Sequence, residues 1–284
     1  MISGGLTVKS THFAMLRCPV CAAGMQADDA GRSCRCTGAR THSYDFARSG
    51  YLNLTRPGDG EGDLRDAIAA RKLFLSAGYY EPLSNAVNSI LQKLGAKAVL
   101  DAGCGEGYYT NRMASEDRTV LGVDLSRAGI DAAAKQAKQS ATGAAFAVGS
   151  IFSLPVANEA CDAVTNLFAP CCESEFSRVL KENGYLILVG AGERHLMGLK
   201  EVLYENPYLN PGRADLPTKM QKIGRERLTY TVTVEGREAI DALFSMTPYY
   251  WRTSEADRAK LNAIESLTTE LDFDIFIYQK GDQQ

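Results

Sequence analysis

The chain has 284 residues, of which 45% are hydrophobic and 23% are charged, and its formal net charge at pH 7 is −3. This is the composition of an ordinary globular protein, and no run approaches the ~18 apolar residues of a membrane-spanning helix. The first residues lack the basic-then-apolar pattern of a signal peptide, so we expect a cytoplasmic protein with no membrane partner. The small acidic charge excludes a molecule that is basic throughout, as many nucleic-acid binders are.

The first 60 residues carry a cysteine cluster and a basic excess. Four of the eight cysteines precede residue 37, which in a reducing compartment favours a local metal site over disulfides. Cys18 and Cys21 form the C-x2-C half of a tetrahedral zinc site, and the third ligand is either Cys36 or Cys34, or both. Basic residues exceed acidic ones by three here, and four arginines surround the cysteines, which fits a polyanionic partner: Arg17, Arg32, Arg35 and Arg40.

The clearest linker signal is RPGDGEG, residues 56–62, which is rich in glycine and acids. It divides the chain into a small front module, residues 1–58, and a main domain, residues 59–284. The main domain begins with two segments of helical spacing, and Ser84 is the expected N-cap of the second.

Strands and helices then alternate along the chain, which predicts a doubly wound, mainly parallel α/β sheet. A helix ending at Gly184 is expected before the fifth strand, and a helix and two strands follow near the C-terminus. The first five expected strands cover residues 98–103, 119–126, 144–150, 161–168 and 185–190.

The strongest single signal is VLDAGCGEGYYT, a buried strand followed by a glycine-rich turn. A dinucleotide-binding loop spaces its glycines G-x-G-x-x-G, whereas here the third glycine comes one residue early. The D-x-G-x-G-x-G form resembles motif I of class I S-adenosylmethionine-dependent methyltransferases. Asp124 ends the next strand, where an acid in related folds binds the ribose hydroxyls.

The resemblance to class I methyltransferases implies a seven-stranded sheet and a cofactor site along its edge. Two downstream segments, LPVANEACDAVTNLF and FSRVLKENGYLILV, match the fourth and fifth strands of that superfamily. Many members carry an acid after the third strand, whereas this chain has Gly149-Ser150-Ile151, so we expect Ser150 and the backbone to replace it. The cofactor residues implied are Asp101, Gly103, Gly105, Glu106, Gly107, Tyr109, Asp124, Leu125, Ser150, Ile151 and Asn166.

Nearly the whole chain resembles the 23S ribosomal RNA (guanine-N1)-methyltransferase family. The stretches that carry this resemblance are CPVC, HSYDF, GYLNL, AARKLFLSAGYYEPL, DAGCGEGYYT, FAPC, RHLMGLKEVLY and MTPYYW. The resemblance implies a zinc-binding front domain, S-adenosylmethionine as cofactor, a guanine in a 23S rRNA hairpin as acceptor, and a possible homodimer. Subgroups modify neighbouring guanines, and one subgroup is associated with macrolide resistance.

The same resemblance completes the predicted zinc site. Relatives close the site with a cysteine and a histidine that precedes an aromatic residue and Asp, which makes His42 the fourth ligand here. The preferred set is therefore Cys18, Cys21, Cys36 and His42, with Cys34 as the alternative third ligand. Four protein ligands leave no open position, so the zinc is expected to be structural.

The expected acceptor site follows the fourth and fifth strands, because ligands bind at the carboxyl ends of parallel strands. The guanine N1 atom lies on the Watson–Crick edge, so the base must be unpaired or flipped out. Asn166 is a candidate to bind the guanine edge, Phe168 to stack on the base, and His195 to accept the proton. Phe168 in the core and His195 as a packed helix-opening residue are the alternative interpretations.

Two other functions compete with rRNA methylation. A small-molecule methyltransferase would share the sheet, because function depends on sites carried by the fold. A non-catalytic RNA-binding protein would keep a degenerate cofactor fold. The cysteine-rich front argues against the first alternative, and the intact Asp101, Gly103, Gly105 and Asp124 argue against the second.

Overall fold

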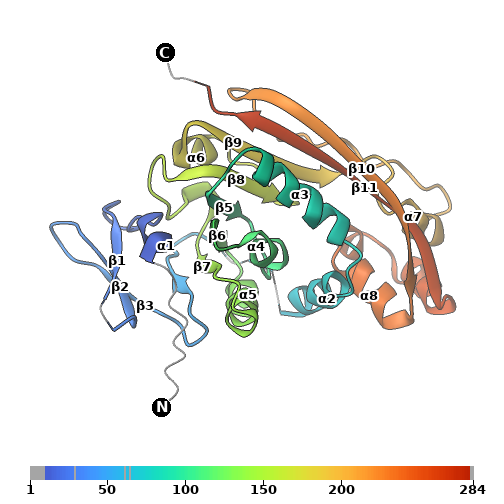
Figure 1. The fold of residues 1–284 in the computed structure, drawn as a ribbon. Helices are drawn as coiled ribbons and strands as arrows, with labels where there is room; N and C mark the ends of the chain where they lie inside the picture. The colour runs from blue at the N-terminus through green and yellow to red at the C-terminus, as the bar shows by residue number, and fades with distance from the viewer. Residues whose placement is uncertain (1–9, 29, 61, 64, 282–284) are drawn as a thin grey trace.

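The computed structural model describes residues 10–28, 30–60, 62–63 and 65–281. In this part of the chain a small three-stranded sheet lies beside a large eight-stranded sheet that helices cover on both faces (Figure 1). The two ends of the large sheet are occupied by segments from opposite ends of the chain, β4 at one edge and β10 at the other. None of the described helices is long and apolar enough to cross a membrane.

The front module is built from short elements. Helix α1 (Ser10–Ala14) is followed by β1 (Met25–Ala27), β2 (Ser33–Cys36) and β3 (Ser43–Asp45), which pair antiparallel in that order. Short strands of three or four residues bury little apolar surface, so such a module needs an additional source of stability.

The large sheet has the order β10-β11-β9-β8-β5-β6-β7-β4. Strands β5 to β9 pair parallel with their neighbours, whereas β11 runs antiparallel to β9, and β10 runs antiparallel to β11. The mainly parallel α/β sheet is thereby confirmed, with eight strands rather than seven, because the two-residue β4 adds to the edge at β7. The bounds are β4 Leu52–Asn53, β5 Ala98–Ala102, β6 Thr119–Asp124, β7 Ala145–Val148, β8 Cys161–Leu167, β9 Leu180–Ala191, β10 Gln221–Glu235 and β11 Ser266–Gln279.

Helices cover the sheet because their apolar stripes match its buried faces. One apolar core packs α2, α3, α7 and α8 against the sheet, and a second joins α6 and the front module to the other side. The helices are α2 Arg65–Ser76, α3 Glu81–Lys93, α4 Tyr108–Met113, α5 Arg127–Ser140, α6 Glu173–Val179, α7 Met197–Leu203, α8 Arg237–Ser245 and α9 Glu255–Ala259, with 3-10 turns η1 Ile151–Ser153, η2 Pro248–Trp251 and η3 Lys260–Ala263.

Two expected element boundaries were wrong. Helix α3 starts at Glu81 with Pro82 in its first turn, and Ser84 lies inside the helix, where its hydroxyl accepts a hydrogen bond from Arg112. Proline suits a first helical turn because its missing N–H has no partner there. Helix α6 ends at Val179 and not at Gly184, because Leu180 pairs with Cys161 and starts β9.

The front module is joined to the large sheet by backbone pairing. Leu16 forms an antiparallel bridge with Val156, and β4 pairs parallel with β7. The first strand of the large sheet therefore precedes the linker. A division of the chain near residue 58 remains our proposal, with β4 as the part of the front that completes the sheet.

Three of the four arginines expected to form a basic surface on the front module are exposed, and the fourth is not. The side chain of Arg17 is only 18% exposed and its guanidinium lies 4.0 Å from Glu175, so it faces the main domain. Arg32, Arg35 and Arg40 remain exposed.

Candidate functional site

Three sulfur atoms and one ring nitrogen converge between the Cys18–Ala23 turn, the end of β2 and the segment before β3. The ligand atoms of Cys18, Cys21, Cys36 and His42 all lie within 4.8 Å of one another. His42 Nδ1 is 3.6 Å from Cys18 Sγ and 3.4 Å from Cys36 Sγ, and Cys21 Sγ is 3.6 Å from Cys36 Sγ. Tetrahedral zinc with usual bond lengths has edges of about 3.8 Å between sulfurs and about 3.6 Å between sulfur and nitrogen. The four residues therefore fit a structural zinc ion.

The distance along β2 favours Cys36 over Cys34 as the third ligand. Cys34 and Cys36 are two residues apart in a strand, which separates them by about 6.6 Å, more than the edge of a zinc tetrahedron. Cys34 is fully buried among apolar side chains, and this burial raises the pKa of its thiol to about 11. A side chain at Gly38 would place its Cβ 3.0 Å from Cys21 Sγ, so the glycine leaves room for the cluster.

The cofactor loop lies at the carboxyl end of β5. Asp101 is buried and accepts hydrogen bonds from the hydroxyls of Thr110, at 2.5 Å, and Thr165, at 2.9 Å. Burial raises the pKa of Asp101 to about 6. The two threonines hold the carboxylate beneath the loop and connect β5 to β8 and α4.

The glycines of this loop are required by close approach and by backbone conformation. Gly103 has φ +82° and a Cβ there would lie 2.4 Å from Ala169 Cβ, while Gly107 has φ +77° and its Cβ would lie 2.6 Å from Ala133 Cβ. Both conformations favour glycine. The contact at Gly103 also brings the cofactor loop directly against the loop that follows β8.

Asp124 organises the same loop from the end of β6. Its carboxylate accepts the backbone N–H of Gly105 at 2.9 Å and that of Ser126 at 2.7 Å, one on each oxygen. Each oxygen keeps a second lone pair, so the group retains capacity to accept hydrogen bonds from ribose hydroxyls.

The other expected cofactor residues lie along the same edge, because β5, β6 and β7 are neighbours in the sheet. Ser150 is buried just after β7, and its hydroxyl caps η1 by accepting the N–H of Phe152 at 3.2 Å. Leu125 and Ile151 are half-buried beside these strand ends.

Three buried polar atoms on the glycine loop and the two residues after it have no hydrogen-bond partner among the described residues. They are Glu106 Oε2 and the hydroxyls of Tyr108 and Tyr109. Glu106 Oε2 lies 3.7 Å from the guanidinium of Arg71, and this guanidinium donates a hydrogen bond to the Asp63 carboxylate at 2.9 Å. Buried polar groups are nearly always satisfied, so these atoms indicate that a polar ligand completes the site.

We expect Glu106 to make cofactor binding sensitive to pH. Burial raises its pKa to about 7, against the opposing charge of Arg71. A cationic cofactor favours the carboxylate, so binding below pH 7 must release a proton, and affinity should rise with pH. By this linkage we expect the dissociation constant for S-adenosylmethionine to be about tenfold larger at pH 6 than at pH 8.

Calorimetric titration of S-adenosylmethionine at pH 6, 7 and 8 tests this expectation. The Glu106→Gln variant should show a flatter profile, while Asp66→Asn, which changes an exposed carboxylate on α2, should behave as the parent protein does. Equal affinities at all three pH values in the parent protein would contradict the prediction.

The expected acceptor site lies at the carboxyl ends of β8 and β9, in the loops that follow these strands. Asn166 is fully buried, and its amide donates to the carbonyl oxygens of Ala102, at 2.9 Å, and Pro170, at 3.2 Å. Its Oδ1 accepts from Arg213 at 2.7 Å. With these groups engaged inside the protein, the geometry favours a positioning role for Asn166 over contact with a base.

Phe168 is the exposed aromatic of this edge. It has φ +56° and its side chain is 45% exposed, so it does not belong to the core. Its ring centroid lies 6.2 Å from that of Tyr80 and 5.8 Å from that of Phe273. A bulky residue in the left-handed region costs about 1–3 kcal/mol, which is typical of functional sites.

His195 is buried and engaged at both ring nitrogens. Its Nδ1 accepts the backbone N–H of Asp272 at 3.2 Å, so the proton is assigned to Nε2, which donates to the hydroxyl of Tyr80 at 3.1 Å. Burial lowers the pKa of His195 to about 4. The imidazole is therefore neutral at pH 7, and the geometry favours orienting Tyr80 over accepting a substrate proton.

Sequence reasoning missed Arg213 and Asp215. Arg213 donates to Val189 O at 3.1 Å, to Ala169 O at 2.7 Å and to Asn166 Oδ1, and pairs with Asp215 at 2.6 Å. Asp215 in turn accepts the N–H of Cys171 at 2.6 Å. The only signal was an Arg-x-Asp pair in a polar loop, which does not indicate its partners.

Similarity to known proteins covers both parts of the chain. Residues 16–55 match the family model described as "RlmA, N-terminal", a zinc ribbon, and residues 94–231 match the model described as "Methyltransferase domain". The protein YxjB of Bacillus subtilis (strain 168), provisionally named a 23S rRNA (guanine-N(1)-)-methyltransferase, is 32% identical over 287 residues, covering 96% of this chain and 99% of the relative. The chain belongs to the 23S rRNA (guanine-N1)-methyltransferase family. It is thus an S-adenosylmethionine-dependent methyltransferase with a zinc ribbon, as expected.

Two further relatives separate this methyltransferase family from the wider fold. The 23S rRNA (guanine(748)-N(1))-methyltransferase of Streptomyces fradiae is 30% identical over 276 residues, covering 92% of this chain and 95% of that one. A malonyl-[acyl-carrier protein] O-methyltransferase of Hamiltonella defensa is 28% identical, but over only 39% of this chain and 46% of its own. Likeness to this O-methyltransferase is therefore limited to part of the chain.

Proposed function

We propose that this protein transfers the methyl group of S-adenosylmethionine to N1 of a specific guanine in a hairpin loop of 23S rRNA. The observation that carries the proposal is Phe168, an exposed aromatic in a left-handed conformation beside the cofactor loop. Unpaired bases of RNA are commonly stacked on such aromatic rings. The relatives that match along most of their length are named as guanine-N1 methyltransferases, which indicates N1 as the methylated atom.

Methyl transfer of this kind depends mainly on how the acceptor atom and the methyl group are positioned. The sulfonium methyl of the bound cofactor would be the electrophile, and N1 must face it in line after the base leaves its stack. The new N–C bond would form as the S–C bond breaks to leave a thioether, and the N1 proton would pass to solvent. Gly103 lies against Ala169, so the acceptor loop and the cofactor loop are packed together, and Phe168 projects from that junction. Asn166 and His195 then act as positioning residues that hold this loop and Tyr80.

Phe168 gives a direct test of the stacking role. The Phe168→Ala variant should lose about tenfold or more in kcat/KM for RNA, because base stacking on an aromatic is worth about 1–3 kcal/mol. Phe168→Tyr should retain most of the activity, and cofactor affinity should be unchanged in both. A fall in cofactor affinity equal to the fall in kcat/KM would contradict a role toward the acceptor.

The function itself is tested with bare 23S rRNA and radiolabelled S-adenosylmethionine, followed by primer extension. A labelled RNA with a strong stop next to one guanine is expected, because N1-methylation blocks Watson–Crick pairing. Label recovered only in small-molecule fractions would overturn the proposal. Action in the cytoplasm, a homodimer and an effect on macrolide susceptibility also remain predictions; sedimentation and growth of a deletion strain on macrolides would test the last two.

A further inference from the structure

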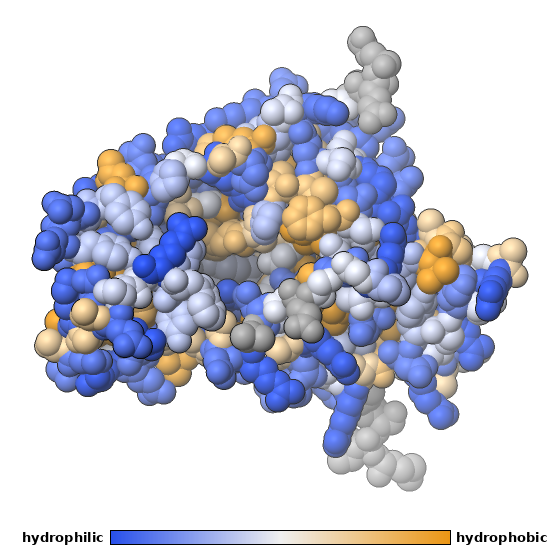
Figure 2. All heavy atoms as spheres, turned by 180° about the vertical axis from the view of Figure 1, so that it is seen from behind, coloured by the Kyte–Doolittle hydropathy of each residue, from blue (hydrophilic) through white to orange (hydrophobic). Residues whose placement is uncertain are grey.

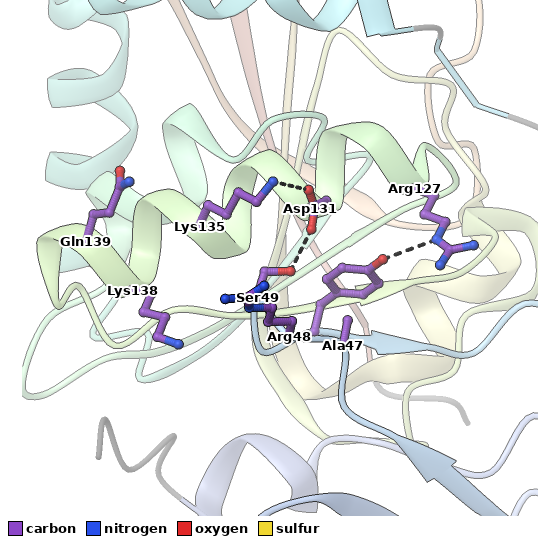
Figure 3. A pocket seen from close by; sticks show the side chains of 9 residues that line it. Ala47, Arg48, Ser49, Arg127, Asp131, Lys135, Lys138 and Gln139 are labelled. Atoms are coloured by element: carbon purple, nitrogen blue, oxygen red, sulfur yellow. Dashed lines mark hydrogen bonds and ion pairs between the residues drawn. The ribbon is translucent and has the colours of Figure 1, made fainter. Parts of the chain in front are cut away.

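A basic groove lies where the front module meets the main domain. It consists of two overlapping hollows of about 690 and 980 Å³, which share Tyr51 and one side of α5. Its walls are the segment between β3 and β4, helix α5 and helix α2 (Figure 3). Its charged lining residues are Arg48, Arg65, Lys72, Arg127, Lys135, Lys138 and Asp131.

The groove has the opposite charge to the rest of the molecule. Six cations face one carboxylate, a local net charge of +5, whereas the whole chain carries −3, so the remainder carries −8. Lys135 pairs with Asp131 at 2.7 Å and Arg127 donates to the hydroxyl of Tyr51 at 3.2 Å. The others are exposed, and within the described ranges they form no ion pair: Arg48, Arg65, Lys72 and Lys138. A concave surface with this charge concentrates anions.

The walls of the groove are fixed to one another. Ser49 donates to Asp131 at 2.6 Å, and Lys135 holds the other oxygen of the same carboxylate, as Figure 3 shows. Tyr51 is buried at the base of the segment, next to β4 and its pairing with β7. A partner in the groove therefore contacts the front module and the methyltransferase domain together.

The floor of the groove lies behind the cofactor loop. Ile68 on α2 lines the groove, and its Cδ1 is 3.2 Å from where a Cβ of Gly129 would lie. That same position is 2.9 Å from the carbonyl oxygen of Gly105 in the cofactor loop. The groove and the cofactor site thus share α2 and the start of α5 as a common wall.

We propose that the basic groove binds the phosphate backbone of the RNA substrate on the flank of the modified loop. Dispersed lysines and arginines on flexible stems suit successive phosphates, which position a nucleic acid without reading its sequence. This inference rests on the proposed function. It moves the main electrostatic contact from the arginines around the zinc cluster to α5, α2 and the segment before β4.

The test uses a triple charge reversal that leaves the groove's internal contacts intact. Arg48→Glu, Lys72→Glu and Lys138→Glu change exposed side chains for which the structure gives no hydrogen bond or ion pair. The matched control reverses Lys93, Lys97 and Lys219, which are exposed outside the groove, just before β5 and β10 begin. Each full-length protein is titrated with 23S rRNA fragments at several salt concentrations, and S-adenosylmethionine binding is measured in parallel.

We expect the groove variant to lose at least tenfold in RNA affinity and to show a shallower salt dependence, by about one unit of slope per lost phosphate contact. The control variant and the cofactor affinities should stay near those of the parent protein. Equal RNA affinity in the groove variant and the parent protein, with rRNA methylation intact, would overturn the groove while leaving the proposed function in place. A parent protein that neither binds nor methylates 23S rRNA would overturn both.

Discussion

The Cys36→Ser variant is expected to lose its zinc and, with it, the folded front module. Zinc bound by four protein ligands contributes on the order of 10 kcal/mol to the folding of small domains at pH 7. The β1–β2 and β2–β3 pairings have three ladder pairs each, and the strands have little core of their own, so they cannot replace that contribution. The Cys34→Ala variant should keep one equivalent of zinc and lose only on the order of 1 kcal/mol for the emptied space.

Metal analysis and limited proteolysis distinguish these two cysteines. Cys36→Ser should contain no zinc and be cleaved rapidly within residues 16–55, while Cys34→Ala should resemble the parent protein. Cofactor binding should persist in both, because the glycine loop lies on β5 and β6. Retention of zinc by Cys36→Ser, or its loss from Cys34→Ala, would show that the cluster uses another third ligand.

The second large effect is expected at Arg213. Its guanidinium holds Val189 O, Ala169 O and Asn166 Oδ1 at once, and it is only 10% exposed. Without it the loop that carries Phe168 loses the contacts that keep its strained backbone in place. We expect Arg213→Ala to reduce kcat about 100-fold, since small displacements of positioning groups have effects of this size. The affinity for S-adenosylmethionine should not change.

Three comparisons test whether Arg213 acts by geometry. Arg213→Lys should recover little activity, because an ammonium cannot reproduce the planar fork of the guanidinium. Added guanidinium ion should partly restore the alanine variant. Arg225→Ala removes a comparable arginine–aspartate pair, with Asp274, from β10 and should leave kcat near that of the parent protein. Loss of cofactor affinity in Arg213→Ala, or no loss of kcat, would contradict the positioning role.

Figure 2 shows the face of the molecule opposite to the view in Figure 1. Most of this face is hydrophilic, and hydrophobic side chains gather around a hollow near its middle (Figure 2). The exposed large apolar side chains of the described residues include Phe152, Phe168, Tyr208 and Trp251.

Local signals were enough for the succession of strands and helices along the chain and for the cofactor loop. Apolar runs followed by glycine turns have a direct local cause, because only glycine adopts φ near +80° at Gly103 and Gly107 without strain. The C-x2-C pair and the acid at the end of β6 are local in the same sense. Where pairing across the sheet competes with local preference, prediction failed, as at Leu180, which joins β9 instead of continuing α6.

The amino-acid sequence by itself therefore determined the fold class, the cofactor loop and the presence of a zinc ribbon, since the alternation of elements and the short motifs are both recorded along the chain. Only the tertiary structure decided between Cys34 and Cys36, placed Arg213 against Asn166 across 47 residues of chain, and assembled the basic groove from three separate segments. The physical reason is that these features are contacts between distant residues. Their geometry is set by how strands and helices pack, and no spacing along the chain records it.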